Sequence, residues 1–284
     1  MRTGWSRLGR PPAERLLGSF DVLHFSDWMY PPQRAGVRAT TIHDLVPLHH
    51  PEWTTARTQS MHSAKYEDAA TTCDVVFVNS AYTGRDVTAT LGVPSERIRV
   101  AHPAPKPVFH EDGPAEDLGA PYALTVATLE PRKNLQVLVE AHRLLGGAFE
   151  LAVVGAEGWG EQPLLDGHGI RRLGYVSDDE LARLYRGAAV VAYPSRFEGF
   201  GIPVVEAMAC GAPVVASAHE SLDEASGAAA LRADSEDPAA FAAALERAVA
   251  DRERLVALGL EHVRRFSWRS VGETFLRGYE EAAR

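Results

Sequence analysis

The chain has 284 residues, a formal net charge of −9, 45% apolar residues and 24% charged residues. This composition is typical of a globular protein, and the length allows one large domain or two of ordinary size. The absence of a basic stripe argues against a nucleic-acid partner. The sequence has no run of 18 apolar residues, and its first 20 residues lack the apolar core of a signal peptide. We therefore expect a soluble, cytoplasmic protein.

The first part of the chain alternates short apolar runs with helical patterns. Residues 1–20 show no strand pattern. Strands are expected at 21–25, 37–42, 74–78 and 98–101, and helices at 57–72 and 81–91. Five prolines between Pro103 and Pro121 then predict an interdomain linker.

The alternation restarts after this proline-rich stretch. Strands are expected at 122–127, 149–154, 170–174, 188–193, 213–216 and 228–231, and helices at 134–145, 179–186, 203–210, 238–249, 251–265 and 268–283. Strands that alternate with helices form parallel sheets with helices on both faces. The sequence therefore predicts two such α/β sheets.

The most informative stretch follows the strand at 188–193. It reads Glu198-Gly-Phe-Gly-Ile-Pro203, and the two glycines allow a bend that side chains would crowd. Pro203 suits the first turn of a helix, and Gly211 ends it. Backbone N–H groups and the positive end of the helix dipole make such a unit a natural anion site.

Two carboxylates, Glu198 and Glu206, frame this bend with seven residues between them. Glu198 can meet a ligand beside the glycine amides, and Glu206 can accept two hydrogen bonds from a vicinal diol. Taken singly, each has a structural interpretation: Glu198 as a solvated loop charge, and Glu206 as a partner of the helix dipole.

A second anion-binding pattern follows the strand at 122–127. Arg132 and Lys133 stand at the start of a helix, where cations oppose the dipole unless an anion lies nearby. The alternative is two solvated cations. Lys133 is one of only three lysines in the chain.

The motif around Glu198 and Glu206 resembles the E-x7-E signature of retaining GT-B glycosyltransferases of family 4, the mannosyltransferase-like group 1. The resemblance implies an α/β GT-B fold of two Rossmann-like domains with a cleft between them. It places Glu198 near the donor sugar and Glu206 on the nucleotide ribose. The amides of Gly199, Phe200, Gly201 and Ile202, with Arg132 and Lys133, would meet sugar and diphosphate. The family's Gly-Arg pair is replaced here by Ala127 and Thr128.

The resemblance extends to two smaller motifs. His43 and Asp44, at the end of the strand at 37–42, resemble the family's His-Asp pair, whose His contacts the reacting sugar. A hydrogen-bonded His at a strand end is the structural alternative. Backbone near Val176 meets the nucleobase in the family, although the surrounding turn is first of all a helix cap.

The implied domains are residues 1–105, a partial acceptor-side domain, residues 106–266, the nucleotide-sugar-binding domain, and residues 267–284, a helix that packs back on the first domain. The family has further strands before the one expected at 21–25, so the first domain is expected to be incomplete. A long unpaired strand edge would then need cover from residues 1–20 or a partner chain.

The expected activity is transfer of a hexose from a nucleotide diphosphate sugar to a hydroxyl acceptor, as in cell-envelope polysaccharide biosynthesis. No Asp-x-Asp metal motif occurs, so no essential metal or cofactor is expected. The resemblance leaves room for peripheral membrane contact and a homodimer. The alternatives are a nucleotide-sugar-binding remnant without turnover, a nucleotide-sugar epimerase and an NAD enzyme. The last is disfavoured because no dinucleotide fingerprint is present.

Overall fold

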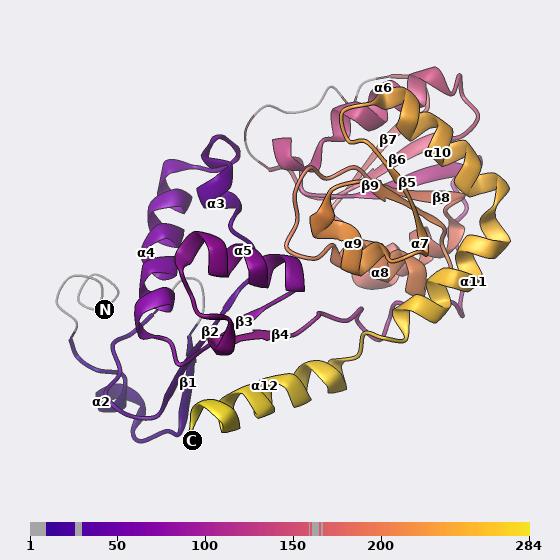
Figure 1. The fold of residues 1–284 in the computed structure, drawn as a ribbon. Coiled ribbons are helices and arrows are strands. Elements are labelled where there is room, and N and C mark those ends of the chain that lie inside the picture. Colours follow the sequence, from indigo (N-terminus) through magenta and orange to yellow (C-terminus); the bar gives the residue numbers. More distant parts are fainter. Residues whose placement is uncertain (1–9, 26–29, 159, 161–164, 166) are drawn as a thin grey trace. The chain divides into compact units, whose positions relative to one another are not determined.

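The computed structural model divides into two compact units, residues 1–103 with 268–284 and residues 104–267 (Figure 1). It describes all residues except 1–9, 26–29, 159, 161–164 and 166. Each unit contains its own parallel sheet, in agreement with the predicted α/β architecture.

The first unit contains a four-stranded sheet in the order β1-β2-β3-β4. Its elements are α2 (Glu14–Leu17), β1 (Val22–Phe25), β2 (Val37–Ile42), α3 (Val46–His49), α4 (Ala56–Thr72), β3 (Val75–Val78), α5 (Ala81–Leu91), β4 (Ile98–Val100) and α12 (Trp268–Ala282), with 3-10 turns at Pro51–Trp53 and Ser95–Arg97.

Alternating residues of the strands in the first unit pack into two separate cores. In β3, Val76 and Val78 pack with residues of α4 and α5, whereas Val75 and Phe77 face Phe275 and other residues of α12. This follows from the period of two along a strand, which sends successive side chains to opposite faces. The last helix of the chain therefore covers one face of the first unit's sheet.

The second unit contains a six-stranded sheet in the order β10-β9-β8-β5-β6-β7. Its elements are β5 (Tyr122–Val126), α6 (Leu135–Leu144), β6 (Glu150–Val154), β7 (Ile170–Gly174), α7 (Asp178–Gly187), β8 (Val190–Tyr193), α8 (Ile202–Ala209), β9 (Val214–Ser217), α9 (Asp223–Ser226), β10 (Ala230–Ala233), α10 (Pro238–Ala250) and α11 (Arg252–Val263), with 3-10 turns at Pro131–Lys133 and Glu220–Leu222.

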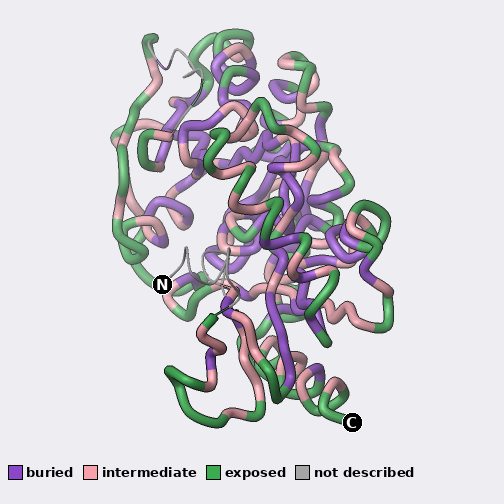
Figure 2. Tube along the Cα trace, turned by 90° about the vertical axis from the view of Figure 1, so that its left-hand side faces the viewer, coloured by how far each residue is buried: buried purple, intermediate pink, exposed green. Residues whose placement is uncertain are grey.

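Helices cover both faces of the second sheet. Val191 and Tyr193 of β8 pack in a core with residues of α7, α8 and α9, while Val190 and Ala192 pack in another with residues of α6 and α10. A strand buried on both sides carries apolar residues without alternation, as β8 does. Figure 2 shows the buried strands in purple.

The proline-rich segment predicted as a linker is instead ordered against the second unit. Phe109 is 4% exposed and belongs to that unit's core. Arg186 of α7 donates to the carbonyls of His110 and Pro114 at 2.9 and 3.2 Å. The linker prediction is therefore wrong beyond Pro103, because the prolines shape a packed segment rather than a spacer.

Strand order brings two loops together at one edge of the second sheet. The chain leaves β5 toward β6 on one side and later returns to β8 on the other. Such a reversal of strand order leaves a crevice beyond the carboxyl ends of the strands, where open α/β sheets bind ligands. The loop after β5 carries Arg132 and Lys133, and the loop after β8 carries Glu198.

Two glycines of α12 give a matched test of its packing. A Cβ on Gly278 would lie 2.7 Å from Phe77 Cζ, whereas a Cβ on Gly272 would meet nothing within 4 Å. We expect Gly278→Ala to lower the free energy of unfolding by about 1–3 kcal/mol through overpacking. Gly272→Ala should instead raise it by up to about 1 kcal/mol through helix propensity. Urea denaturation measures both, and equal effects would contradict the packing described.

Candidate functional site

A buried ion cluster joins the loops that follow β5 and β8. The Glu198 carboxylate accepts from Arg132 Nη1 through Oε2 and from Lys133 Nζ through Oε1, both at 2.6 Å. The hydroxyl of Tyr193 donates to the same Oε1 at 2.9 Å. The Glu198 side chain is 9% exposed and that of Lys133 12%. Arg132, Lys133 and Glu198, predicted from separate motifs, therefore lie in direct contact.

Local backbone contacts hold the two loops of this cluster in place. The amide of Glu198 donates to Ser221 Oγ at 3.0 Å. Asn134 adopts the left-handed conformation with φ 51° and ends the turn that carries Arg132 and Lys133. Its side-chain amide donates to Ser235 O at 2.6 Å. These contacts fix the direction in which the two cations leave the backbone.

Charge pairing outweighs burial in the cluster. Burial raises the pKa of Glu198, but the charges of Lys133 and Arg132 dominate and lower it to about 2. Burial likewise opposes the charge on Lys133, yet Glu198 and Tyr193 outweigh it and raise the pKa of Lys133. All three groups are therefore charged at neutral pH.

The glycine bend between the two glutamates has the predicted form. Gly201 has φ 100° and precedes α8, and a Cβ at this position would lie 2.5 Å from Leu222 Cδ2. Only glycine fits both constraints. Phe200 is 2% exposed and packs edge-on against Phe266, whereas Ile202 is 38% exposed at the start of the helix.

Glu206 stands on α8 in a different environment from Glu198. The hydroxyl of Tyr185 approaches its Oε2 at 3.5 Å, at the limit of hydrogen bonding. Burial raises the pKa of Glu206 to about 7, with Asp178 adding to the rise and Lys106 opposing it. Lys106 is engaged by Asp178 at 2.7 Å. Glu206 is thus a half-buried carboxyl group that forms no ion pair with the residues that the structure describes.

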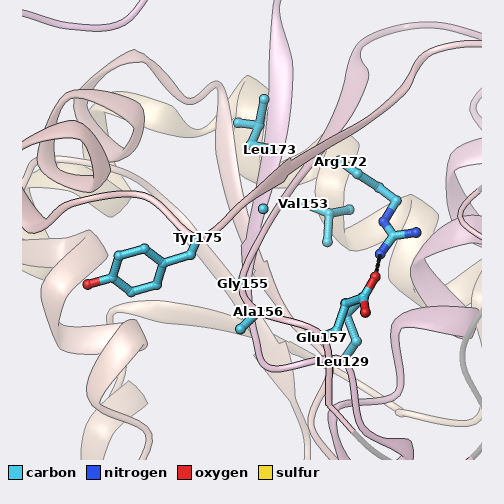
Figure 3. Close-up of a pocket in the computed structure, with 9 residues that line it drawn as sticks. Leu129, Val153, Gly155, Ala156, Glu157, Arg172, Leu173 and Tyr175 are labelled. Atoms are coloured by element: carbon cyan, nitrogen blue, oxygen red, sulfur yellow. Dashed lines mark ion pairs between the residues drawn. The ribbon is translucent and has the colours of Figure 1, made fainter.

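A cavity of about 430 Å³ lies at the carboxyl ends of β6 and β7. Figure 3 shows Leu129 and Glu157 at one side of it and Tyr175 at the other, with an ion pair of 3.7 Å between Glu157 and Arg172. Gly155 lines it and approaches the loop after β5 so closely that a Cβ would lie 1.8 Å from Ala127 O. Trp159, which follows this glycine in the chain, lies outside the described residues.

Val176 directly follows Tyr175, which lines this cavity. Its side chain is half-buried against the core that contains residues of α7 and α8. The next residue, Ser177, forms a capping box with Glu180, as the predicted helix cap requires. The turn therefore caps α7 and borders the cavity as well.

His43 and Asp44 belong to the first unit, at the carboxyl end of β2. The imidazole of His43 is exposed and lies 3.1 Å from Asn79 Nδ2, at the end of the neighbouring strand β3. The Asp44 carboxylate accepts from the amide of Val46 at 3.0 Å. The Asp44 side chain therefore closes a turn just before α3, whose N-cap residue is Leu45.

Four site residues were not predicted from the sequence. Tyr185 and Tyr193 contact the two glutamates, Lys106 lies near Glu206, and Glu130 accepts from Arg132 at 2.7 Å. Tyr193 ends a predicted strand beside the motif, which was a usable signal. Tyr185 and Lys106 meet Glu206 only through the fold, and Glu130, two residues before Arg132, carries no local sign that it is buried.

Comparison with known proteins gives matches to glycosyltransferases. The sequence matches the family model described as "Glycosyltransferase Family 4" over residues 2–104 and "Glycosyl transferases group 1" over residues 120–251. O-antigen chain mannosyltransferase B of Escherichia coli is 32% identical over 92% of this chain and 74% of its own length. D-inositol 3-phosphate glycosyltransferase of Acidothermus cellulolyticus is 28% identical over 96% of this chain and 70% of its own.

Solved structures show the same fold. Sucrose-phosphate synthase from Thermosynechococcus elongatus has a TM-score of 0.74 and 21% identity, covering 95% of this chain and 75% of its own. HepE from Anabaena, solved with UDP and glucose, has a TM-score of 0.71 and 16% identity, covering 87% and 72%. The fold and the buried motif define a GT-B glycosyltransferase. The chain belongs to glycosyltransferase family 4, enzymes that move a sugar from a nucleotide sugar to an acceptor.

Among the described residues, no helix combines the length and apolar character needed to cross a membrane.

The high pKa of Glu206 predicts a gain in stability when its charge is removed. A folded pKa of about 7, above the usual value near 4.5, means that its contribution to stability is full below pH 4.5 and is lost as pH rises through 7. Glu206→Gln should therefore raise the free energy of unfolding at pH 8 by up to about 3 kcal/mol and flatten its pH dependence. Urea denaturation at pH 5 and 8 measures this. Glu246→Gln, on exposed α10 surface, is the control, and a loss of stability at pH 8 would refute the prediction.

The ion cluster predicts strong coupling between Lys133 and Glu198. Removing either partner leaves the other charge buried without its full compensation. Lys133→Met and Glu198→Gln should therefore each destabilise the protein by about 2–4 kcal/mol. The double variant should lose at least about 1 kcal/mol less than the sum of the two. A double-mutant cycle from denaturant unfolding measures the coupling. Additive losses would show that the two groups do not interact.

Proposed function

We propose that the second unit binds the nucleotide diphosphate sugar at the crevice beyond β5 and β8, and that the enzyme transfers its hexose with retention of configuration. The observation that supports this most is the contact of Arg132 and Lys133 with Glu198. Two cationic side chains held at a helix start beside a glycine bend provide fixed hydrogen-bond donors for a diphosphate.

In this proposal the residues of the E-x7-E motif have different tasks. Glu206 accepts two hydrogen bonds from the ribose diol, for which its ionised form is the better acceptor. The amides from Gly199 to Ile202 meet the sugar and the diphosphate. Glu198 orients Lys133 and Arg132 and positions the donor sugar.

The nucleobase is proposed to lie against Val176. The cavity in Figure 3 supports this position, because it is bordered by the adjoining Tyr175 and lies at the same edge of the sheet as the ion cluster. Its lining combines apolar side chains with the Glu157 and Arg172 charges, a mixture suited to a flat heterocycle with polar edges.

The proposed reaction breaks the bond between the anomeric carbon and the diphosphate oxygen and forms one to the acceptor oxygen. Both events occur on the same face of the sugar, and the acceptor's proton passes to the leaving diphosphate. Arg132 and Lys133 balance the charge that develops on that group. We propose His43, with Asp44 beside it, as the group that contacts the reacting sugar.

The donor is proposed to carry a hexose, with mannose as the first candidate because O-antigen chain mannosyltransferase B is a relative. The alternative is a protein that binds nucleotide sugars without turnover. Incubation with GDP-mannose, UDP-glucose and UDP-N-acetylglucosamine, with nucleoside diphosphate release as the readout, separates the two. Release above a Lys133→Met control supports the enzyme, whereas thermal stabilisation without release supports the binding protein.

Glu206 gives the sharpest test of the nucleotide site. Glu206→Ala should weaken binding of the nucleoside diphosphate by about 1–3 kcal/mol through loss of the diol hydrogen bonds. Isothermal titration calorimetry measures the change, with Glu246→Ala as a surface control. Unchanged affinity in Glu206→Ala would remove this residue from the site.

A further inference from the structure

The loop after β5 carries a second buried carboxylate beside Arg132. Glu130 Oε1 accepts from Arg132 Nη2 at 2.7 Å, while Nη1 of the same guanidinium donates to Glu198 Oε2 at 2.6 Å. The Glu130 side chain is 5% exposed and that of Arg132 17%. The guanidinium is therefore held between two carboxylates that approach its two terminal nitrogens.

The four charged groups of this cluster cancel. Arg132 and Lys133 contribute two positive charges, and Glu130 and Glu198 contribute two negative ones. The attraction of a polyanion to such a group scales with its net charge. A neutral cluster therefore holds a diphosphate through directed hydrogen bonds, with less general attraction than two unopposed cations would provide.

We propose that Glu130 is a positioning residue that holds Arg132 toward Glu198 and sets the net charge of the diphosphate site to zero. This inference rests on the proposed donor site. Its consequence concerns product release, because a nucleoside diphosphate carries one more ionisable oxygen than the sugar ester from which it forms. Without Glu130 the site would attract the product more than the donor, and the product would leave more slowly.

Two substitutions separate charge from position. Glu130→Gln removes the charge and keeps an oxygen that can accept from Arg132, whereas Glu130→Ala removes both. We expect Glu130→Gln to bind inorganic pyrophosphate, UDP and GDP about three- to tenfold more tightly at low salt, with the gain shrinking as salt screens the added charge. Product inhibition should strengthen by a similar factor. Glu130→Ala should lose at least about tenfold in kcat relative to Glu130→Gln, because Arg132 is no longer oriented.

Glu236 provides a matched control from the same neighbourhood. It forms an ion pair of 2.6 Å with Arg196, whose guanidinium also donates to Pro131 O at 3.2 Å, but its side chain is 62% exposed. Glu236→Gln should leave pyrophosphate affinity and kcat unchanged. Calorimetry at two salt concentrations measures the binding, and steady-state kinetics with the donor that turns over measures kcat and KM.

Failure of the role of Glu130 and failure of the proposed donor site give different results. Unchanged or weaker anion binding in Glu130→Gln, with wild-type binding intact, overturns the role of Glu130 alone. An equal gain in anion affinity in Glu236→Gln also overturns it, because the gain would then come from the protein's overall charge and not from Glu130. The wild type could also fail to bind pyrophosphate, UDP and GDP, with nucleoside diphosphate release unchanged in Lys133→Met. That result would overturn the donor site and this inference together.

Discussion

The second unit depends on the buried contact between Glu198 and the two cations of the loop after β5. A carboxylate that is 9% exposed is costly unless charges of the opposite sign lie against it. Lys133 and Arg132 meet that need, and their contacts with Glu198 join the loop after β5 to the loop after β8. In the proposed function, the same contacts direct both cations to the edge of the sheet where the diphosphate would bind. One arrangement would then both stabilise the loops and prepare the proposed site for its ligand.

The two glutamates of the motif illustrate how environment separates identical side chains. Glu198 has close cations, and its pKa falls to about 2. Glu206 is half-buried beside Tyr185, and its pKa rises to about 7. Two carboxyl groups whose pKa values differ in this way are suited to different tasks. The permanent charge of Glu198 organises the cations. The weakly held charge of Glu206 is a cost to the folded protein that a ligand with two hydroxyl donors would offset.

The sequence was sufficient for the strands and long helices, because short apolar runs and caps such as Ser177 are local signals. The ion cluster was partly predictable, since Lys133 and Glu198 follow strands that a reversal of strand order brings side by side. The packed state of the segment around Phe109 was not predictable, because its prolines suit a spacer equally well. Tyr185, Lys106 and Glu130 were missed for a related reason: their roles come from partners distant in the chain or from burial, which no spacing encodes.

The most direct measurement is an experimental structure of the protein with a bound nucleoside diphosphate. The account predicts the diphosphate oxygens within hydrogen-bond distance of Arg132 and Lys133, the ribose hydroxyls on the Glu206 carboxylate, and the base beside Val176. A nucleotide bound elsewhere on the second unit, or one bound here with Glu206 turned away from the ribose, would contradict it.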